Sequence, residues 1–315
     1  MNDLEKYMLR KTILELLLKI DQGGYSHLLI DHEIKAKKFS EKDVALLTEI
    51  VYGTIQRKLT LDFYLEHFIH TKKKIQPWVW MLLRMSVYQM VYLDKVPDHA
   101  VIHEAVEISK QRGHKGVASF VNGVLRNVQR KGLPDISEIK DDAQRLSIET
   151  SHPLWLVENW IEMYGYETTK KICIANLQDK PVSIRIQPMR IEMEDALAKL
   201  KEEGYRVRRS RIADQGIVIE QGNILKSPLF KNGFVTIQDQ SSMLAGIMLD
   251  PKPGMTVLDA CSAPGGKATH LAELMENSGK IHAHDLHPNK IKEINKRAEQ
   301  LQLTIIDAKQ VDARN

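Results

Sequence analysis

The stretch Asp259-Ala260-Cys261-Ser262-Ala263-Pro264-Gly265-Gly266-Lys267 joins a short apolar run, residues 255–259, to a helical pattern that starts at Lys267. The apolar run ends in an acid and is typical of a β-strand. Two adjacent glycines follow, and because glycine has no Cβ atom the backbone there can approach a ligand closely. A strand, a glycine-containing loop and a helix in this order predict the first unit of a doubly wound α/β domain.

The residues that follow continue this pattern. Residues 280–284 indicate a second strand, which Asp285 closes, and residues 288–300 indicate a helix. Residues 304–311 lead into a third strand, which Asp312 closes. Strand, helix, strand, helix and strand make up the first half of a Rossmann-type sheet. We therefore expect residues 236–315 to form part of a Rossmann-like domain.

The preceding sequence has a different character. Residues 1–133 repeat apolar positions at helical spacing in consecutive segments, which predicts an all-α bundle. Residues 134–150 are polar and are expected to be a linker. Residues 151–235 mix helical patterns with runs of period-two alternation, as in Val182-Ser183-Ile184-Arg185-Ile186, and predict a small α+β unit. The expected fold class is thus multidomain: an all-α bundle, a small α+β unit and a partial α/β domain.

Composition restricts the class of protein. The chain has 315 residues, 43% of them hydrophobic, and a formal net charge of +4, which permits a polyanionic partner without requiring one. Its two cysteines, Cys173 and Cys261, exclude a disulfide scaffold and form no metal-ligand spacing, so no metal is expected. The sequence begins without a signal-peptide pattern and has no apolar stretch of roughly 20 residues, which predicts a cytoplasmic protein with no membrane partner.

The loop also restricts the ligand. A nucleoside cofactor at such a sheet needs close backbone approach after strand one, an acid after strand two and a polar group after strand three. Gly265-Gly266, Asp285 and Asp312 meet these needs in order. The loop has no Gly-x-Gly-x-x-Gly pattern, and Ala268 follows Gly266-Lys267 where a P-loop has Ser or Thr. S-adenosylmethionine has no phosphate, and its carboxylate suits free N–H groups at a helix start, so it is preferred over a nicotinamide dinucleotide.

The loop resembles motif I of the Nol1/Nop2/Sun family of RNA cytosine-C5 methyltransferases. The preceding run Val235-Thr236-Ile237-Gln238-Asp239-Gln240-Ser241-Ser242 is also typical of that family. The start of the chain, with Pro97-Asp98-His99-Ala100 and the run over residues 120–126, resembles a NusB-type RNA-binding domain. The resemblance covers the whole chain. It implies that the contacts to S-adenosylmethionine are Cys261, Ser262, Ala263, Pro264, Gly265, Gly266, Lys267, Asp285 and Asp312.

The resemblance further implies methylation of cytosine C5 in 16S ribosomal RNA. In this family a cysteine thiolate adds to C6 of the base and makes C5 nucleophilic. The family carries that cysteine in motifs after strands four and five, so we expect the nucleophile beyond Asn315 and no catalytic residue in this chain. Residues 1–315 alone are then expected to be inactive as a methyltransferase. Cys261 is expected to line the cofactor pocket.

Basic runs are the candidates for RNA contact. Arg206, Arg208, Arg209 and Arg211 are clustered in the small α+β unit, where contacts to an RNA backbone are expected, and Lys72-Lys73-Lys74 is a second, weaker candidate. Two alternatives to the methyltransferase stay open. One is a non-catalytic NusB-like RNA-binding module, and the other, which the loop disfavours, is a nicotinamide-dependent oxidoreductase.

Overall fold

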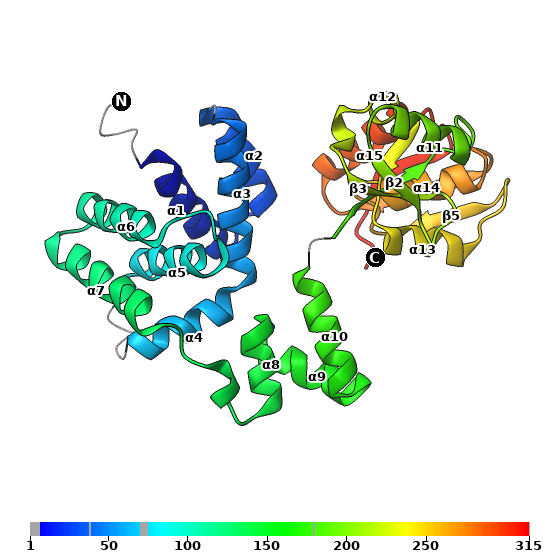
Figure 1. The fold of residues 1–315 in the computed structure, drawn as a ribbon. Helices are drawn as coiled ribbons and strands as arrows, with labels where there is room; N and C mark the ends of the chain where they lie inside the picture. Colours follow the sequence, from blue (N-terminus) through cyan, green and yellow to red (C-terminus); the bar gives the residue numbers. More distant parts are fainter. Residues whose placement is uncertain (1–6, 38, 70–74, 179, 315) are drawn as a thin grey trace. The chain divides into compact units, whose positions relative to one another are not determined.

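The structure is a computed structural model that describes residues 7–37, 39–69, 75–178 and 180–314. The chain divides into two compact units, residues 1–178 and residues 179–315, and each is described by itself. Figure 1 shows helices alone in the first unit and mixed helices and strands in the second. The basic run Lys72-Lys73-Lys74 lies outside the described residues.

A helical bundle forms most of the first unit. Its helices are α1 (Met8–Asp21), α2 (Ser26–Lys37), α3 (Glu41–Gln56), α4 (Lys58–Phe68), α5 (Pro77–Tyr92), α6 (Asp98–Arg112) and α7 (Lys115–Lys131). Helix α5 begins with Pro77 at a position where the missing N–H costs nothing, and nearly all of its side chains from Val79 to Gln89 are buried. It contacts α1, α3, α4, α6 and α7 and is therefore the centre of the core.

The chain then forms three shorter helices. A 3-10 turn, η2 (Ile136–Glu138), precedes α8 (Asp142–Thr150), α9 (Leu154–Tyr164) and α10 (Tyr166–Leu177). Leu146, Val157 and Cys173 form a small core between these three helices. The segment 134–150 that was expected to be a linker thus contains α8, whose start Asp141 caps by accepting a hydrogen bond from the Gln144 N–H at 2.7 Å. The compact units divide after residue 178, and the domain limits expected from the sequence stay predictions.

The second unit begins with a small antiparallel sheet. Its strands are β1 (Val182–Ile186), β2 (Arg206–Arg209), β3 (Gly216–Gln221) and β4 (Val235–Ile237), in the order β2-β3-β1-β4. The other elements of this part are α11 (Met193–Glu202), η3 (Ile224–Lys226) and α12 (Pro228–Lys231). The strand predicted over residues 182–186 is confirmed as β1. It lies inside the sheet, between β3 and β4, and all its residues from Ser183 to Ile186 are buried.

A parallel sheet follows. Helix α13 (Gln240–Leu249) leads to β5 (Thr256–Asp259), α14 (Gly266–Leu274), β6 (Lys280–Asp285), α15 (Pro288–Gln300) and β7 (Ile306–Gln310). Within the described residues these strands pair in the order β5-β6-β7. Apolar residues of α14, α15 and the inner strands, such as Leu271, Ile281 and Ile294, form the core. Helical bundle, α+β unit and parallel α/β part confirm the expected fold class.

Candidate cofactor-binding site

The loop between β5 and α14 has a conformation that requires its glycine. Gly265 has φ +93°, in the left-handed region, and directly precedes the first turn of α14. Its N–H donates to the Ser262 carbonyl at 2.7 Å, and the Ser262 N–H donates to the His284 carbonyl at 2.9 Å. The Ala263–Pro264 peptide bond is cis. The loop is therefore a tight turn that is tied to the neighbouring strand β6.

Asp285 and Asp312 stand at the same edge of the sheet as this loop, because the strands run parallel. Asp285 Oδ2 accepts a hydrogen bond from the Ala263 N–H at 3.0 Å, and Oδ1 accepts one from the His287 N–H at 3.4 Å. Asp312, just after β7, binds the Arg314 guanidinium through both oxygens, at 2.9 and 2.6 Å. Hydrogen bonds from Arg314 keep the pKa of Asp312 below its ordinary value.

Unsatisfied polar atoms at the loop test whether a polar ligand would fit. Asp259 Oδ2 and Ser262 Oγ are buried and have no hydrogen-bond partner among the described residues. Buried polar atoms without partners are rare, because each costs free energy that a hydrogen bond would recover. Cys261, Pro264 and Lys267 are exposed around them, and Cys261 is a free thiol. The residues present therefore fit a polar cofactor at this loop.

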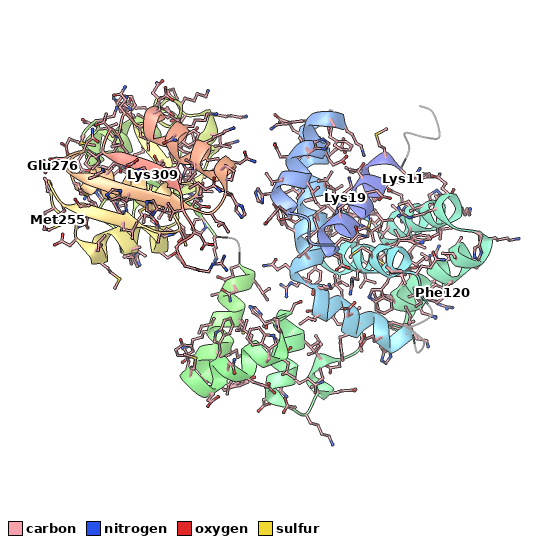
Figure 2. The ribbon with its side chains drawn as sticks, turned by 180° about the vertical axis from the view of Figure 1, so that it is seen from behind. Lys11, Lys19, Phe120, Met255, Glu276 and Lys309 are labelled. Atoms are coloured by element: carbon pink, nitrogen blue, oxygen red, sulfur yellow. The ribbon has the colours of Figure 1, made fainter. Side chains whose placement is uncertain are left out.

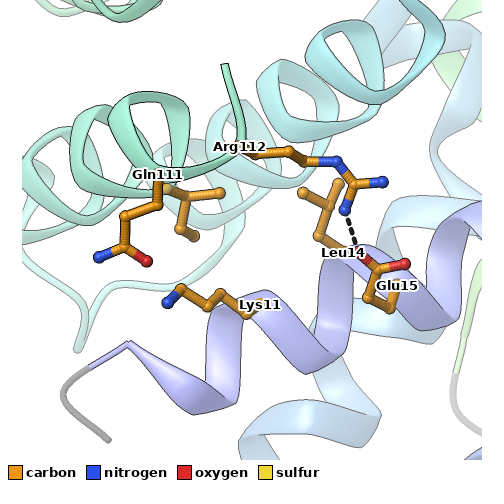
Figure 3. Close-up of a pocket in the computed structure, with 6 residues that line it drawn as sticks. Lys11, Leu14, Glu15, Gln111 and Arg112 are labelled. Carbon is orange, nitrogen blue, oxygen red and sulfur yellow. Dashed lines mark hydrogen bonds and ion pairs between the residues drawn. The ribbon is translucent and has the colours of Figure 1, made fainter. Parts of the chain in front are cut away.

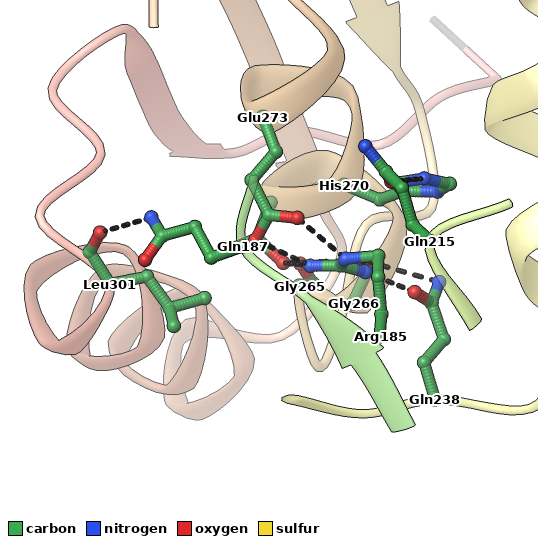
Figure 4. A network of polar contacts seen from close by, with 10 residues as sticks. Arg185, Gln187, Gln215, Gln238, Gly265, Gly266, His270, Glu273 and Leu301 are labelled. Carbon is green, nitrogen blue, oxygen red and sulfur yellow. Dashed lines mark hydrogen bonds and ion pairs between the residues drawn. The ribbon is translucent and has the colours of Figure 1, made fainter. Parts of the chain in front are cut away.

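A buried ion pair, which the sequence reasoning missed, joins α14 to strand β1 of the antiparallel sheet. Arg185 of β1 is 1% exposed and donates to both carboxylate oxygens of Glu273, from Nε at 2.6 Å and from Nη2 at 2.8 Å. Arg185 Nη1 also donates to the Gly266 carbonyl at 3.1 Å and to the Gln238 side chain. Figure 4 shows Arg185 between Glu273, in the last turn of α14, and Gly266, in its first turn. The signal in the sequence was an arginine in a predicted strand and a glutamate in an apolar helix.

His270 extends the same polar cluster. Its Nε2 lies 2.8 Å from Gln215 Oε1, as Figure 4 shows. Nδ1 faces Gly246 so closely that a Cβ atom there would stand 2.7 Å from it. Burial, together with the positive charge of Arg185, lowers the pKa of His270 to about 3. The imidazole is therefore neutral near pH 7.

Comparisons with known proteins give three family models that match successive parts of the chain. The NusB family model matches residues 8–130, the ferredoxin-like domain of RsmF/B-like methyltransferases matches residues 152–225, and the 16S rRNA methyltransferase RsmB/F model matches residues 246–315. The chain is 48% identical to the probable ribosomal RNA small subunit methyltransferase B of Bacillus subtilis, over 99% of this chain and 70% of that protein.

The chain belongs to the ribosomal RNA small subunit methyltransferase B family. The probable member of this family from Synechocystis is 31% identical over 90% of this chain, and the chain covers 65% of its length. Among solved structures, the crystal structure of PH0851 matches with a TM-score of 0.76 and 26% identity, over 96% of this chain and 69% of that one. A methyltransferase homologue from Pyrococcus horikoshii has a TM-score of 0.50 and 28% identity, over 54% of this chain and 56% of that one.

The basic run of this family member is partly neutralised. Arg206 and Arg208 pair with Glu220 across the β2–β3 ladder, at 3.3 and 3.2 Å, and Arg209 pairs with Glu194. Arg211 follows β2 and has no ion pair within the described residues. All three paired guanidinium groups are largely exposed, so these pairs are weak. Contact between these four arginines and RNA stays a prediction.

The helical unit has a charged pocket of its own. A cavity of about 310 Å³ lies between α1 and α6, lined by Lys11, Glu15, Arg112 and apolar neighbours. Arg112 pairs with Glu15 and also stands 5.4 Å from the Trp78 ring centre, so its charge is already matched. Figure 3 shows Lys11 on the same side of the pocket as Glu15.

In the described part of the chain, no three His, Cys, Asp or Glu side chains gather as a metal site would require. No helix among the described residues combines the length and the apolar content of a bilayer span.

Proposed function

We propose that this chain takes part in the S-adenosylmethionine-dependent methylation of cytosine C5 in 16S ribosomal RNA, in the cytoplasm. The observation that carries the proposal is the loop from Cys261 to Lys267 at the carboxyl edge of β5, with Asp285 and Asp312 at the same edge. The matched family models and the 48% identical relative support it. The chain spans 65 to 70% of the two bacterial relatives, so activity of the whole protein is part of the proposal.

Each residue of the site has a proposed task. Backbone N–H groups at Gly266 and Lys267 would hold the carboxylate of the cofactor at the start of α14. Asp285 would accept hydrogen bonds from the ribose hydroxyls, while its Oδ2 still holds the Ala263 N–H. Asp312 would accept from the exocyclic amine of adenine, with Arg314 holding its carboxylate in place.

When bound, S-adenosylmethionine supplies an activated methyl group on a sulfonium. The residues of this chain bind and orient it: Ser262 and Asp259 have polar atoms available, and Arg185 steadies the first turn of α14. Cys261 is exposed on the loop, where we propose that it lines the pocket. The thiolate that would attack C6 of cytosine is proposed to come from outside residues 1–315.

One experiment separates the candidate functions. The chain is titrated with S-adenosylmethionine and with NADH by calorimetry, and methyl transfer to small-subunit RNA is then assayed. We expect S-adenosylmethionine binding, no NADH binding and no transfer. Transfer by these 315 residues would contradict the proposed origin of the nucleophile. RNA binding without S-adenosylmethionine binding would instead favour a non-catalytic NusB-like module, which the match over residues 8–130 keeps open.

We also propose that the basic run contacts the RNA backbone. Changing Arg206, Arg208 and Arg211 together to Gln should weaken binding to small-subunit RNA and flatten its dependence on salt, because fewer counterions are released. RNA affinity is measured between 50 and 200 mM salt, and Lys201→Gln on the exposed end of α11 is the control. An unchanged salt slope in the triple variant would argue against this contact.

A further inference from the structure

A cleft beside the cofactor loop contains an arginine that has no partner in the part of the chain that the structure describes. The cleft has a volume of about 320 Å³ and opens in the second unit between the edge strand β4, α12 and α15. Phe230, Thr236, Ile237, Arg297 and Gln300 are among the residues that line it. None of the lining side chains is acidic.

Arg297 supplies an unmatched positive charge. The side chain is half-buried, and among the described residues it makes no hydrogen bond and no ion pair. Burial, and then the positive charge of Arg185, lower the pKa of Arg297, while Glu293 opposes them. A partly desolvated guanidinium lacks the solvation that an anion would restore, so an anion in the cleft would be stabilised there. Arg112 in the helical unit differs, because Glu15 already neutralises it.

Neutral donors stand beside this charge. Thr236 is 8% exposed, and its hydroxyl makes no hydrogen bond in the described part of the chain. The Phe234 carbonyl accepts a hydrogen bond from the N–H of Gln187, directly after β1, and the Gln238 N–H donates to the Ser183 carbonyl of β1. Because alternate residues of an antiparallel strand point opposite ways, the N–H of Ile237 points to the open edge of β4. A guanidinium, a hydroxyl and a free N–H together suit the oxygens of a phosphate.

The cleft adjoins the proposed cofactor site. Arg297 Nη1 lies 3.3 Å from the point where a Cβ atom on Gly266 would stand. Gly266 is the first residue of α14 and belongs to the cofactor loop. An anion bound at Arg297 would therefore lie next to that loop.

We propose that this cleft binds a backbone phosphate of the RNA substrate, with Arg297 as the principal contact and Thr236 as a second one. The inference rests on the proposed function, because it takes RNA as the substrate. It adds a specific RNA subsite on α15 and β4, away from the basic run of β2.

The test compares two substitutions on one helix. Arg297→Gln removes the charge in the cleft, and Lys296→Gln removes the charge of an exposed neighbour. Binding of each chain to a transcript of small-subunit ribosomal RNA is measured by fluorescence anisotropy between 50 and 200 mM salt. We expect Arg297→Gln to weaken binding about tenfold and to reduce the salt slope by about 1, as the loss of one phosphate contact should. Lys296→Gln should change the affinity less than twofold.

Thr236→Val keeps the shape of the side chain and is a second variant in case Arg297→Gln fails to fold. It should weaken RNA binding about threefold, since it removes one neutral hydrogen bond. Equal affinities of the Arg297→Gln and Lys296→Gln chains would overturn the inference while leaving the proposed function intact. No RNA binding by the unaltered chain, even where S-adenosylmethionine binds, would overturn the proposed RNA substrate and the subsite with it. Calorimetric binding of inorganic phosphate that Arg297→Gln abolishes, with RNA affinity unchanged, would show a free-anion site and overturn the RNA assignment.

Discussion

At the scale of single residues, Asp285 already binds backbone N–H groups, in addition to the ribose contact that we propose for it. The sequence placed an acid after the second strand for the ribose of a cofactor. In the structure the same carboxylate already accepts hydrogen bonds from the N–H groups of Ala263 and His287. Each carboxylate oxygen has a second lone pair, so both tasks are compatible. Asp285 therefore holds the loop and still has acceptor capacity for the proposed ribose contact.

Asp285→Asn should weaken S-adenosylmethionine binding by about 1–3 kcal/mol, because charge-assisted hydrogen bonds to the ribose and to the loop become neutral. Calorimetric titration measures the loss. Asp307→Asn is the matched control, since Asp307 lies on β7 and pairs with Lys309 at 3.0 Å. Equal affinities in the two variants would rule out a ribose contact at Asp285.

His270 predicts a dependence of stability on pH. Its pKa is about 3 in the folded chain and about 6.5 when unfolded, so the unfolded chain binds the extra proton between these values. The stability that His270 contributes is thus complete above pH 6.5 and is lost as the pH falls toward 3, at up to about 1.4 kcal/mol per pH unit. His270→Gln should flatten this fall, as measured by urea unfolding at pH 7, 6 and 5. His287→Gln, at an exposed histidine, should leave the fall unchanged.

At the scale of elements, the antiparallel sheet and α14 act as one support for the cofactor loop. Arg185 of β1 binds Glu273 in the last turn of α14 and the Gly266 carbonyl in its first turn. Two charges buried this deeply are tolerated because they pair with each other and because the remaining donors of Arg185 bind Gln238, Thr269 and the Gly266 carbonyl. The small α+β unit therefore has a structural part in placing the loop, beyond any contact with RNA.

Removing one partner of this pair should be costly. Arg185→Met leaves the Glu273 carboxylate buried without its cation, so we expect about 3–5 kcal/mol less stability in the second unit, measured by urea unfolding. The double variant Arg185→Met with Glu273→Leu should recover much of this loss, because it leaves no uncompensated charge. A double variant as unstable as the sum of the two single ones would show that the pair itself contributes little.

At the scale of the whole molecule, the two units differ in how well their apolar surfaces are covered. The bundle surrounds α5 on many sides. In the second unit, β5 is an edge strand, and Leu258 on it is 61% exposed, while Met248 on α13 is 85% exposed. Figure 2 shows Met255 and Glu276 at one end of the parallel sheet, with Lys309 away from them on β7. Exposed apolar side chains at a sheet edge lower stability and favour aggregation.

Hydrogen exchange should therefore be faster in residues 239–314 than in the core of the bundle. We expect the amides of β5, β6 and β7 to exchange through openings of lower free energy than those of α5. Mass spectrometry of the full chain measures both at once. Protection of the parallel strands equal to that of α5 would show that the exposed apolar edge costs little.

The sequence by itself determined the fold class and the loop, because both depend on local patterns: helical periodicity, period-two alternation, and glycines between a strand and a helix. Helix α15 was predicted over residues 288–300, as the structure has it. Only the tertiary structure decided that Arg185 meets Glu273, 88 residues away, or that Arg297 lies beside Gly266 with no hydrogen-bond or ion-pair partner among the described residues. Such pairings depend on how separate elements pack, and no local pattern encodes the packing of a strand on a distant helix.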